Sequence, residues 1–267
     1  MNLEENVKYN NLLTYLKRYK SIAVAFSGGV DSTFLLAVSQ TAIKDRLIAL
    51  TIRTPYIPNW EISEAAQFVS DKGITHKIID LPFIQKLKPN PKDRCYWCKT
   101  YLFQNLLKET KSLGYEVLMD GTNYDDLSDY RPGLQALKEL GIVSPFLELK
   151  ITKDEIRRFS QTLKLPTWEK PAYACLLTRI PYGQEIINGE LKRIEQAEVY
   201  LMQMGFKGHR VRLHGDLARI EFQQSDFEKV LQKELFNAIS AKMKEIGFTY
   251  ITLDMEGYRT GSHNESL

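Results

Sequence analysis

Residues 23–34, "AVAFSGGVDSTF", place a glycine-rich loop between an apolar run and a helical pattern. The run "IAVAF" is short and contains a β-branched residue at its centre, which predicts a buried strand. The following "STFLLAVSQTAI" has helical spacing, and Asp31 or Ser32 is the expected N-cap. Gly28 and Gly29 let the backbone turn tightly and come close to a ligand. Because the start of a helix offers backbone N–H groups and the positive end of its dipole, the segment predicts an anion site, most naturally for phosphate.

An acid in this loop distinguishes it from the Walker type of phosphate loop. A Walker loop needs a lysine before its serine or threonine to reach the β- and γ-phosphates, whereas Asp31 precedes Ser32 here. A carboxylate at this position suggests that Mg²⁺ shares the site. The alternative is an ordinary glycine-rich turn that binds nothing.

Length, charge and cysteine content narrow the class of protein. A chain of 267 residues accommodates one large domain or two modest ones. Its 36 basic and 33 acidic residues give a net charge of +3, which does not demand a nucleic-acid partner. There is no signal-peptide pattern, and no apolar run approaches the ~18 residues of a membrane span. Three cysteines argue against a secreted disulfide framework. We therefore expect a cytoplasmic protein with no membrane or nucleic-acid partner.

Strand and helix patterns alternate through the first part of the chain. Such alternation predicts an α/β fold with a parallel sheet and right-handed crossovers, whose ligands lie at the carboxyl ends of the strands. The pattern breaks near residue 166, which predicts an α/β domain at 1–168 and a smaller α+β domain at 169–267. Expected elements are strands at 22–26, 46–52, 75–81 and 116–123 and helices at 4–19, 60–73, 99–114, 131–141 and 152–165; in the second domain, helices at 189–205 and 225–246, a hairpin at 209–223 and a strand at 248–254.

A second polar loop, "DGTNYDDLSDYRPG" (120–133), follows the fourth expected strand. Because it leaves a strand end of the same sheet, we expect it to share a rim with the glycine-rich loop. The alternative is a solvated acidic turn, since Asn and Asp favour turns. The candidate ligands in it are Asp120, Asn123, Asp125 and Asp126, with Arg131 as a possible bidentate anion clamp.

The three cysteines are candidate metal ligands. "RCYWCK" places Cys95 and Cys98 at a helix start, and Cys175 lies in the loop "PAYACLLTRIPYG". Three thiols can build a metal site if the fold joins them, and a four-iron cluster held by three thiolates leaves one iron open to a sulfide or substrate sulfur. A zinc site would want a fourth ligand. A redox pair at 95 and 98, or unrelated packing thiols, are the alternatives.

Cations flank the third cysteine. Lys170 precedes Cys175 and Arg179 follows it at four residues, and nearby cations lower the pKa of a thiol. The other interpretation of Cys175 is a small buried hydrophobic residue.

The segment 209–222, "HRVRLHGDLARIEF", alternates strictly around a His-Gly-Asp turn. Arg210 and Arg212 share one predicted face, to which Glu221 can belong, and Glu198 on the preceding helix is a possible neighbour. One interpretation is a pocket for the phosphate of a substrate. The other is a solvated face of a hairpin.

These segments together resemble a known family. "SGGVDS" resembles the phosphate loop of the PP-loop ATP pyrophosphatases, which activate substrates at the α-phosphate of ATP and release pyrophosphate. "RCYWCK", "DGTNYDDLSDYRPG", "PAYACLLTRIPYG" and "RVRLHGDLARIE" resemble, in order and over nearly the whole chain, one branch of that superfamily. That branch is the LarE family of ATP-dependent sulfur transferases, which make the nickel-pincer cofactor of lactate racemase.

The resemblance implies a mechanism. A carboxylate of pyridinium-3,5-biscarboxylic acid mononucleotide is adenylated with loss of pyrophosphate, and a sulfur nucleophile then displaces AMP to give a thiocarboxylate. In one subgroup a cysteine at the place of Cys175 gives up its own sulfur and becomes dehydroalanine. Another subgroup has three cysteines and holds a [4Fe–4S] cluster that carries an extra sulfide. The three cysteines here resemble the second subgroup, and the family implies a homo-oligomer, usually a hexamer.

The resemblance also implies site roles. Cys175, Asp31 and Arg179 are expected to take part in the chemistry, with a separate donor supplying sulfide. The rival interpretations are a PP-loop tRNA thiolase with a three-cysteine cluster, an amide-forming ligase of the NAD synthetase kind, and an adenine-nucleotide binding module with a structural zinc. The expected ligands of ATP and Mg²⁺ are Ser27, Gly28, Gly29, Asp31, Ser32, Asp120, Asn123, Asp126 and Arg131; those of the cluster are Cys95, Cys98 and Cys175; and those of the substrate phosphate are Arg210, Arg212, Glu198 and Glu221.

Overall fold

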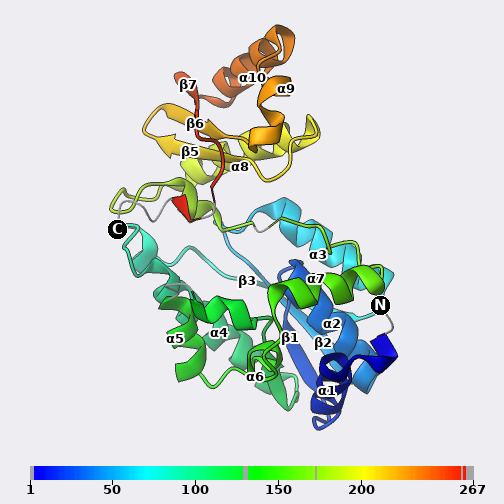
Figure 1. Ribbon diagram of the computed structural model, residues 1–267. Coiled ribbons are helices and arrows are strands. Elements are labelled where there is room, and N and C mark those ends of the chain that lie inside the picture. The colour runs from blue at the N-terminus through cyan, green and yellow to red at the C-terminus, as the bar shows by residue number, and fades with distance from the viewer. Residues whose placement is uncertain (1–2, 129–131, 172, 260, 263–267) are drawn as a thin grey trace. The chain divides into compact units, whose positions relative to one another are not determined.

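Four parallel strands in the order β3-β2-β1-β4 form the larger sheet of the computed structural model (Figure 1). In β1, Ile22 pairs with Leu47 of β2 on one side and with Val117 of β4 on the other, so β1 is an interior strand. This sheet confirms the predicted α/β class. The structure describes residues 3–128, 132–171, 173–259, 261 and 262. The strands are β1 (Ile22–Ala25), β2 (Leu47–Arg53), β3 (Thr75–Asp80) and β4 (Val117–Met119).

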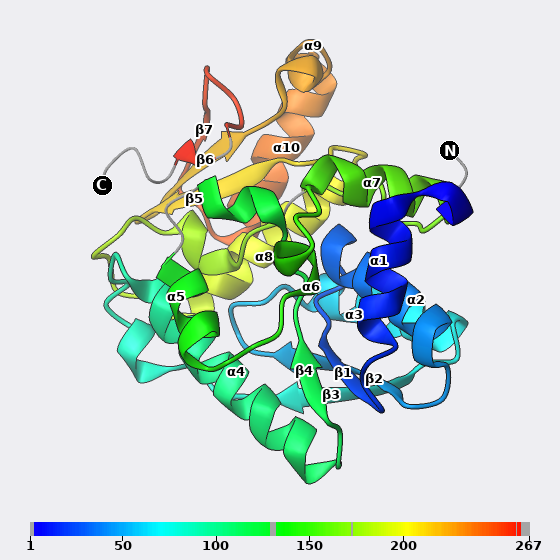
Figure 2. The same cartoon turned by 60° about the horizontal axis from the view of Figure 1, so that its bottom comes forward.

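Helices cover both faces of this sheet (Figure 2). Helices α1, α2 and α7 pack against one another on one side, and α4 and α5 pack together on the other. Phe34 of α2 stacks on Phe146 and Phe159, with ring centroids 5.5 and 5.6 Å apart, in the centre of the core. These helices are α1 (Val7–Leu16), α2 (Val30–Ile43), α3 (Asn59–Asp71), α4 (Arg94–Ser112), α5 (Pro132–Glu139), α6 (Pro145–Glu148) and α7 (Lys153–Thr162), with 3₁₀ turns at Leu3–Glu5, Gln85–Leu87 and Tyr124–Ser128.

The chain divides into two compact units. The second unit includes short pieces of the β2–α3 and β3–α4 connections, which join it through backbone hydrogen bonds. The amide of Leu176 donates to the carbonyl of Tyr56 (2.9 Å), and the amide of Gly183 donates to that of Asn90 (3.0 Å). That the chain forms two separate domains with a boundary at residue 168 stays a prediction. The first unit is Met1–Thr54, Asn59–Pro82 and Asp93–Lys170, and the second is Pro55–Pro58, Phe83–Lys92 and Pro171–Leu267.

A three-stranded sheet in the order β5-β6-β7 forms the second unit. Strands β5 and β6 are the predicted hairpin, in which Arg210 lies opposite Glu221 and Arg212 opposite Arg219. Strand β7 adds to β6 in parallel, because α9 and α10 carry the chain back across the unit. The elements are β5 (Arg210–His214), β6 (Leu217–Glu221), β7 (Tyr250–Leu253), α8 (Asn188–Gln203), α9 (Phe227–Val230) and α10 (Lys233–Ile246), with 3₁₀ turns at Leu176–Arg179 and Gln224–Asp226.

Three expectations about element ends were wrong. The N-cap of helix α2 is Gly29, which has an extended backbone, and not Asp31 or Ser32. The Ser32 hydroxyl is not free to cap the helix, because it donates to the Gly29 carbonyl. Helix α4 begins at Arg94 rather than at residue 99, so the cysteine pair lies in its first turns. The helix expected over 225–246 is interrupted at Gln232, which has an extended conformation.

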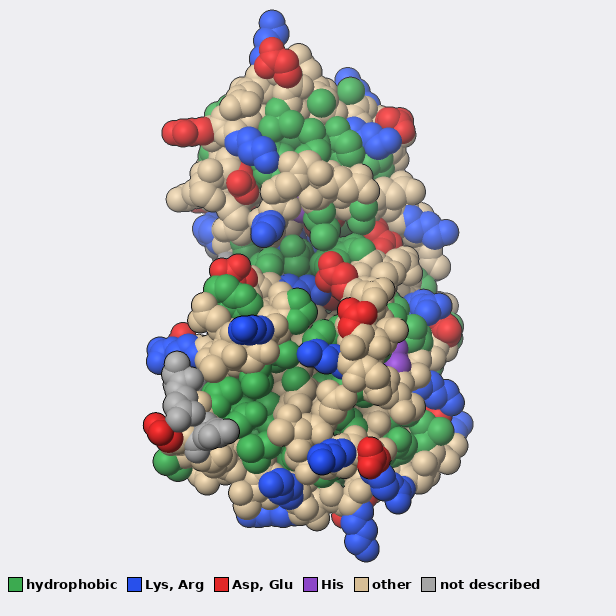
Figure 3. All heavy atoms as spheres, turned by 90° about the vertical axis from the view of Figure 1, so that its right-hand side faces the viewer, with side chains coloured by type: hydrophobic (Ala, Val, Ile, Leu, Met, Phe, Trp, Pro, Cys, Tyr) green, Lys and Arg blue, Asp and Glu red, His purple; other side chains and the backbone are tan. Residues whose placement is uncertain are grey.

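The surface carries charges of both signs. Lysine and arginine side chains are interspersed with aspartate and glutamate over the face shown in Figure 3. Among the described residues, none of the helices combines the length and the apolar character needed to cross a bilayer.

Candidate functional site

The glycine loop, residues 26–32, leaves the carboxyl end of β1 and begins α2. Gly28 has φ +71°, and a Cβ there would lie 3.1 Å from the Cβ of Ala65 on α3, so both conformation and space require glycine. The hydroxyls of Ser27 and Ser32 lie 3.1 Å apart across the loop, and the Ser32 hydroxyl accepts from the Ser27 amide at 3.3 Å. This arrangement fixes the first-turn amides of α2 at the rim of the sheet, where they can receive an anion.

The loop after β4 lies directly beside the glycine loop. A Cβ on Gly121 would lie 3.0 Å from both the Asp31 Cβ and the Ser32 amide, so the two backbones approach closely. Asn123 donates from Nδ2 to Oδ1 of Asp31 at 3.4 Å. The structure thus brings the two sequence-predicted loops together at the carboxyl ends of β1 and β4, as parallel neighbours in one sheet must be.

The acids of this second loop have separate partners. Asp120 is buried and accepts from the hydroxyls of Thr122 and Ser144. Asp126 accepts from the amide of Asn123 at 3.0 Å and thereby closes the turn. Asp120 and Asp126 therefore shape the loop, and Asn123 carries its contact with the glycine loop. Arg131, the expected anion clamp, lies outside the described residues.

Asp31 has a cationic partner that the sequence did not indicate. The Lys153 ammonium, at the first residue of α7, donates to Oδ2 of Asp31. Burial raises the pKa of Asp31 and the charge of Asp126 adds to this effect, while Lys153 opposes it without cancelling it. No local pattern could reveal Lys153, because it lies 122 residues beyond Asp31.

A second lysine, Lys170, contacts the backbone of the glycine loop. Lys170 donates to the carbonyl of Gly28 at 3.1 Å and to Glu64 at 2.7 Å. Its Nζ also lies 5.4 Å from the centroid of the Trp60 ring. Two residues of α3 thus hold the end of the first unit against the glycine loop.

None of the three cysteines takes part in a disulfide. Cys95 and Cys98 stand three residues apart in the first turns of α4, on one face of the helix, with Cys95 exposed and Cys98 half-buried. Cys175 belongs to the second unit. Within the described residues, no group of three or more His, Cys, Asp or Glu side chains forms a metal site, so the three-thiol site stays a prediction.

Arg179 supports the backbone of the Cys175 segment. Its side chain is 1% exposed and forms a two-point ion pair with Glu198 of α8, Nε to Oε1 at 2.8 Å and Nη2 to Oε2 at 2.9 Å. The remaining nitrogen donates to the carbonyls of Ala174 (2.8 Å) and Cys175 (3.2 Å). Sequence reasoning placed Arg179 near the thiol; the contacts in the structure are with the carboxylate and with the main chain on either side of the cysteine.

The charged face of the hairpin is buried. Arg210 is 2% exposed, Arg212 6% and Glu221 1%, so the solvated interpretation was wrong at these three positions. Arg212 forms a two-point ion pair with Glu221, with both N–O distances 2.8 Å, and donates to the carbonyl of Thr178 at 2.7 Å. The hairpin is therefore tied to the turn that follows Cys175.

Arg210 has a different environment from Arg212. Its guanidinium carbon lies 5.1 Å from the ring centroid of Tyr173 and 4.6 Å from that of Tyr258. It also donates to the carbonyl of His209 at 2.7 Å. Burial, with the charge of Arg179, lowers the pKa of Arg210. A buried cation in contact with two aromatic rings is suited to an anionic ligand.

Glu198 is the centre of this network. It pairs with Arg179, and its Oε1 accepts from the amide of Val211 at 3.0 Å, which fixes the start of β5. Burial opposes its ionisation, but Arg179, the charge of Arg210 and the Val211 amide together outweigh burial and lower the pKa of Glu198. The carboxylate is therefore ionised in the folded unit at neutral pH.

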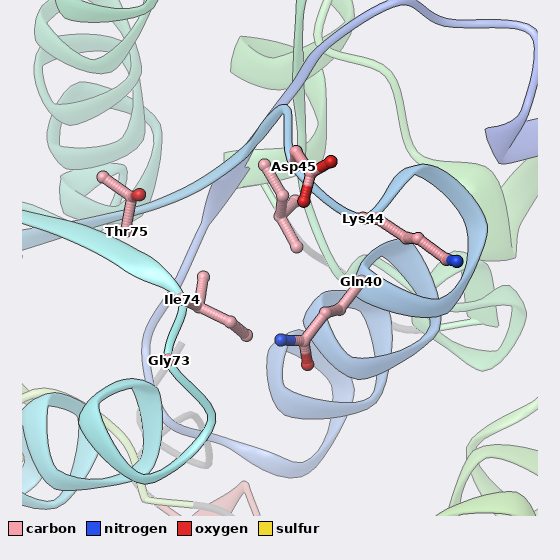
Figure 4. A pocket seen from close by; sticks show the side chains of 7 residues that line it. Gln40, Lys44, Asp45, Gly73, Ile74 and Thr75 are labelled. Atoms are coloured by element: carbon pink, nitrogen blue, oxygen red, sulfur yellow. The ribbon is translucent and has the colours of Figure 1, made fainter.

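A pocket of about 340 Å³ opens at the other end of the larger sheet (Figure 4). It lies where Leu47 begins β2 and Thr75 begins β3, beside Lys44 and Asp45 after α2. The glycine loop follows the carboxyl end of β1, so this pocket is not part of the candidate site.

Comparison with known proteins shows which family the chain resembles. Residues 21–92 match the family described as queuosine biosynthesis protein QueC. An uncharacterised protein of Synechocystis sp. is 38% identical over 97% of this chain and 98% of its own length, and one of Methanocaldococcus jannaschii is 36% identical over 97% and 98%. The pyridinium-3,5-bisthiocarboxylic acid mononucleotide synthase of Lactiplantibacillus plantarum is 31% identical over 97% of this chain and 95% of its own.

A parallel sheet whose interior strand β1 is followed by Ser-Gly-Gly-Val-Asp-Ser at the start of α2 defines an ATP-dependent enzyme of the PP-loop class. Within that class, similarity over the full length narrows the assignment. The chain belongs to the LarE family, the family of the pyridinium-3,5-bisthiocarboxylic acid mononucleotide synthase.

Proposed function

We propose that this protein adenylates the carboxylates of pyridinium-3,5-biscarboxylic acid mononucleotide and converts them to thiocarboxylates. The observation that carries the proposal is the 31% identity to the synthase over 97% of the chain, with the glycine loop formed at the sheet edge. Cytoplasmic location, a sulfide donor and a homo-hexameric assembly belong to the proposal as features of the family.

In the proposed first step, a carboxylate oxygen of the substrate attacks the α-phosphorus of ATP, and pyrophosphate leaves with the electron pair of the broken P–O bond. Ser27, Gly28, Gly29 and Ser32 hold the departing pyrophosphate with backbone and hydroxyl donors. Asp31 is the carboxylate proposed to bind Mg²⁺ at the loop; Asn123 donates to its Oδ1 and Lys153 to its Oδ2. Asp120 and Asp126 shape the neighbouring loop, and Arg131 is proposed as an added anion contact.

Arg210 and Arg212 are proposed to hold the 5′-phosphate of the mononucleotide. The support is their burial on one strand and the two rings that flank Arg210. Glu198 and Glu221 fix this strand and its arginines, and Arg179 joins Glu198 to the main chain at Cys175. Substrate bound at β5 would thus lie in the unit that carries this cysteine.

Three thiols are the kind of ligand that a [4Fe–4S] cluster takes, and the proposal is that Cys95, Cys98 and Cys175 together hold one. Cys95 and Cys98 lie on one face of α4, and Cys175 lies before a turn held by Arg179; none of the three is in a disulfide. When bound by these three thiolates, such a cluster would supply sulfide for the activated carboxyl group. The protein's part is to bind these ligands and to present the acyl-adenylate.

Asp31→Asn tests the role of the glycine loop. We expect Mg²⁺-dependent pyrophosphate release to fall roughly 100-fold, because charge stabilisation worth several kcal/mol is lost from the phosphates. Asp45→Asn, an exposed aspartate of the same unit, is the matched control and should leave the rate unchanged. Products are identified by ³¹P NMR, and ADP with orthophosphate in the wild type would sink the PP-loop assignment of this reaction.

Arg210→Met tests the proposed phosphate contact. Loss of a charge-assisted hydrogen bond worth ~1.5–3 kcal/mol should weaken binding of the mononucleotide about 10- to 150-fold and leave ATP affinity unchanged. Arg18→Met removes an arginine that also lies over a tyrosine ring, 5.4 Å from the Tyr15 centroid, and serves as the control. Calorimetric titration of folded protein is the measurement, and equal affinities would remove Arg210 from the site.

A further inference from the structure

The cation beside the glycine loop comes from α7. The loop itself contains no lysine, and its acid, Asp31, is held at Oδ2 by the ammonium of Lys153 and at Oδ1 by Asn123. Both side chains are partly open to solvent, with 31% exposure for Lys153 and 23% for Asp31. The pair therefore lies where a diffusing ligand can reach it.

Lys153 occupies a position that is unfavourable for a lysine. It is the first residue of α7, after the Thr152 N-cap, where the positive end of the helix dipole repels an ammonium group. Two acids offset this cost: Asp31 at the side chain, and Asp125 at the main chain, where it accepts from the Lys153 amide at 2.7 Å. The fold thus keeps a cation at the loop at some cost to helix stability.

The other lysine at the loop is held differently. Lys170 is 14% exposed and donates to a carbonyl of the loop, with Glu64 and Trp60 as its further partners. Its contacts support the loop backbone. Lys153 contacts the carboxylate that is proposed to share Mg²⁺, so an arriving metal ion would compete with the Lys153 ammonium for Asp31.

We infer that Lys153 holds the cation position on Asp31 until Mg²⁺ and ATP bind, and then donates to a phosphate oxygen of the pyrophosphate that leaves. This inference rests on the proposed function. It gives the loop the ammonium that its own sequence lacks, in a reaction that concentrates negative charge on pyrophosphate. Lys153 acts by binding alone, and it forms and breaks no covalent bond.

Two binding measurements without turnover test the inference, and they are expected to change in opposite directions. In Lys153→Met, Mn²⁺ measured by EPR without nucleotide should bind about two- to fivefold more tightly, because a competing cation at a partly exposed carboxylate is gone. Inorganic pyrophosphate, titrated calorimetrically with saturating Mg²⁺, should bind about 10- to 150-fold more weakly. Lys153→Arg should restore most of the pyrophosphate affinity.

Controls separate this role from support of the loop. Lys108→Met, at an exposed position of α4, should change neither affinity, and Lys170→Met should weaken both together. If Lys153→Met also weakens both, or changes neither, Lys153 is a structural contact and the inference is overturned. Wild-type protein that binds neither Mn²⁺ nor pyrophosphate would overturn the proposed function as well.

Discussion

Glu198→Gln should make the second unit about 3–5 kcal/mol less stable, because it leaves Arg179 as a buried charge without its counter-ion. Both side chains are almost fully buried, at 1% exposure for Arg179 and 3% for Glu198. The amide of glutamine can still accept the bond from the Val211 amide, so the loss reports the charge and not the geometry of β5. Because Trp60, Trp97 and Trp168 all lie in the first unit, tryptophan fluorescence is the wrong probe. Native-state hydrogen exchange of a peptide covering 205–222 measures the change directly.

The control and the pH dependence sharpen this result. Glu245→Gln breaks an exposed pair with Lys242 in the same unit and should cost at most ~0.5 kcal/mol. Since Arg179 lowers the pKa of Glu198 in the folded state, the pair contributes stability above the unfolded value of about 4.3, and this is lost as pH falls toward the folded pKa. Acidification should therefore destabilise the wild type more than the variant. If Glu198→Gln lowers the stability of the second unit by less than ~1 kcal/mol at pH 7, the expected contribution of this ion pair is contradicted.

Local pattern was sufficient to predict the larger sheet and the glycine loop. A short apolar run, two glycines and a helical pattern lie together in residues 23–34, and parallel strands necessarily bring their carboxyl ends to one edge. The predicted N-cap of α2 was wrong. Ser32 is a good capping residue by type, but its hydroxyl forms hydrogen bonds within the glycine loop. Helical spacing in the sequence was enough to predict α2, whereas its first residue depends on the hydrogen bond from the Ser32 hydroxyl to the Gly29 carbonyl.

Contacts distant in the chain could not be predicted. Lys153 and Lys170 reach the loop from 122 and 142 residues away. The alternation in β5 correctly indicated a charged face, but its burial depends on α8 and on the turn after Cys175, which the hairpin pattern does not encode. For the same reason the pairing of Glu198 with Arg179, rather than with the hairpin arginines, became visible only in the fold.

The source of the sulfur gives the other large expected effect. With sulfide supplied anaerobically, we expect each chain to produce more than one thiocarboxylate and to keep its full intact mass, because Cys175 acts as a cluster ligand in the proposed function. Cys95→Ser and Cys98→Ser should each abolish repeated sulfur transfer but leave pyrophosphate release intact, since adenylation depends on the glycine loop. Iron and sulfide content, measured on the same samples, should fall in both variants.

Mass analysis decides between this route and a sacrificial one. If Cys175 donates its own sulfur, turnover stops at one event and the chain becomes ~34 Da lighter, as cysteine converts to dehydroalanine. The serine variants at 95 and 98 would then react once, as the wild type does, because neither thiol takes part. Stoichiometric loss of sulfur at Cys175 would falsify the cluster route. The contacts of Arg179 with the carbonyls of Ala174 and Cys175 are compatible with both routes. They fix the main chain at Cys175, and the two routes differ only in what happens to its thiol.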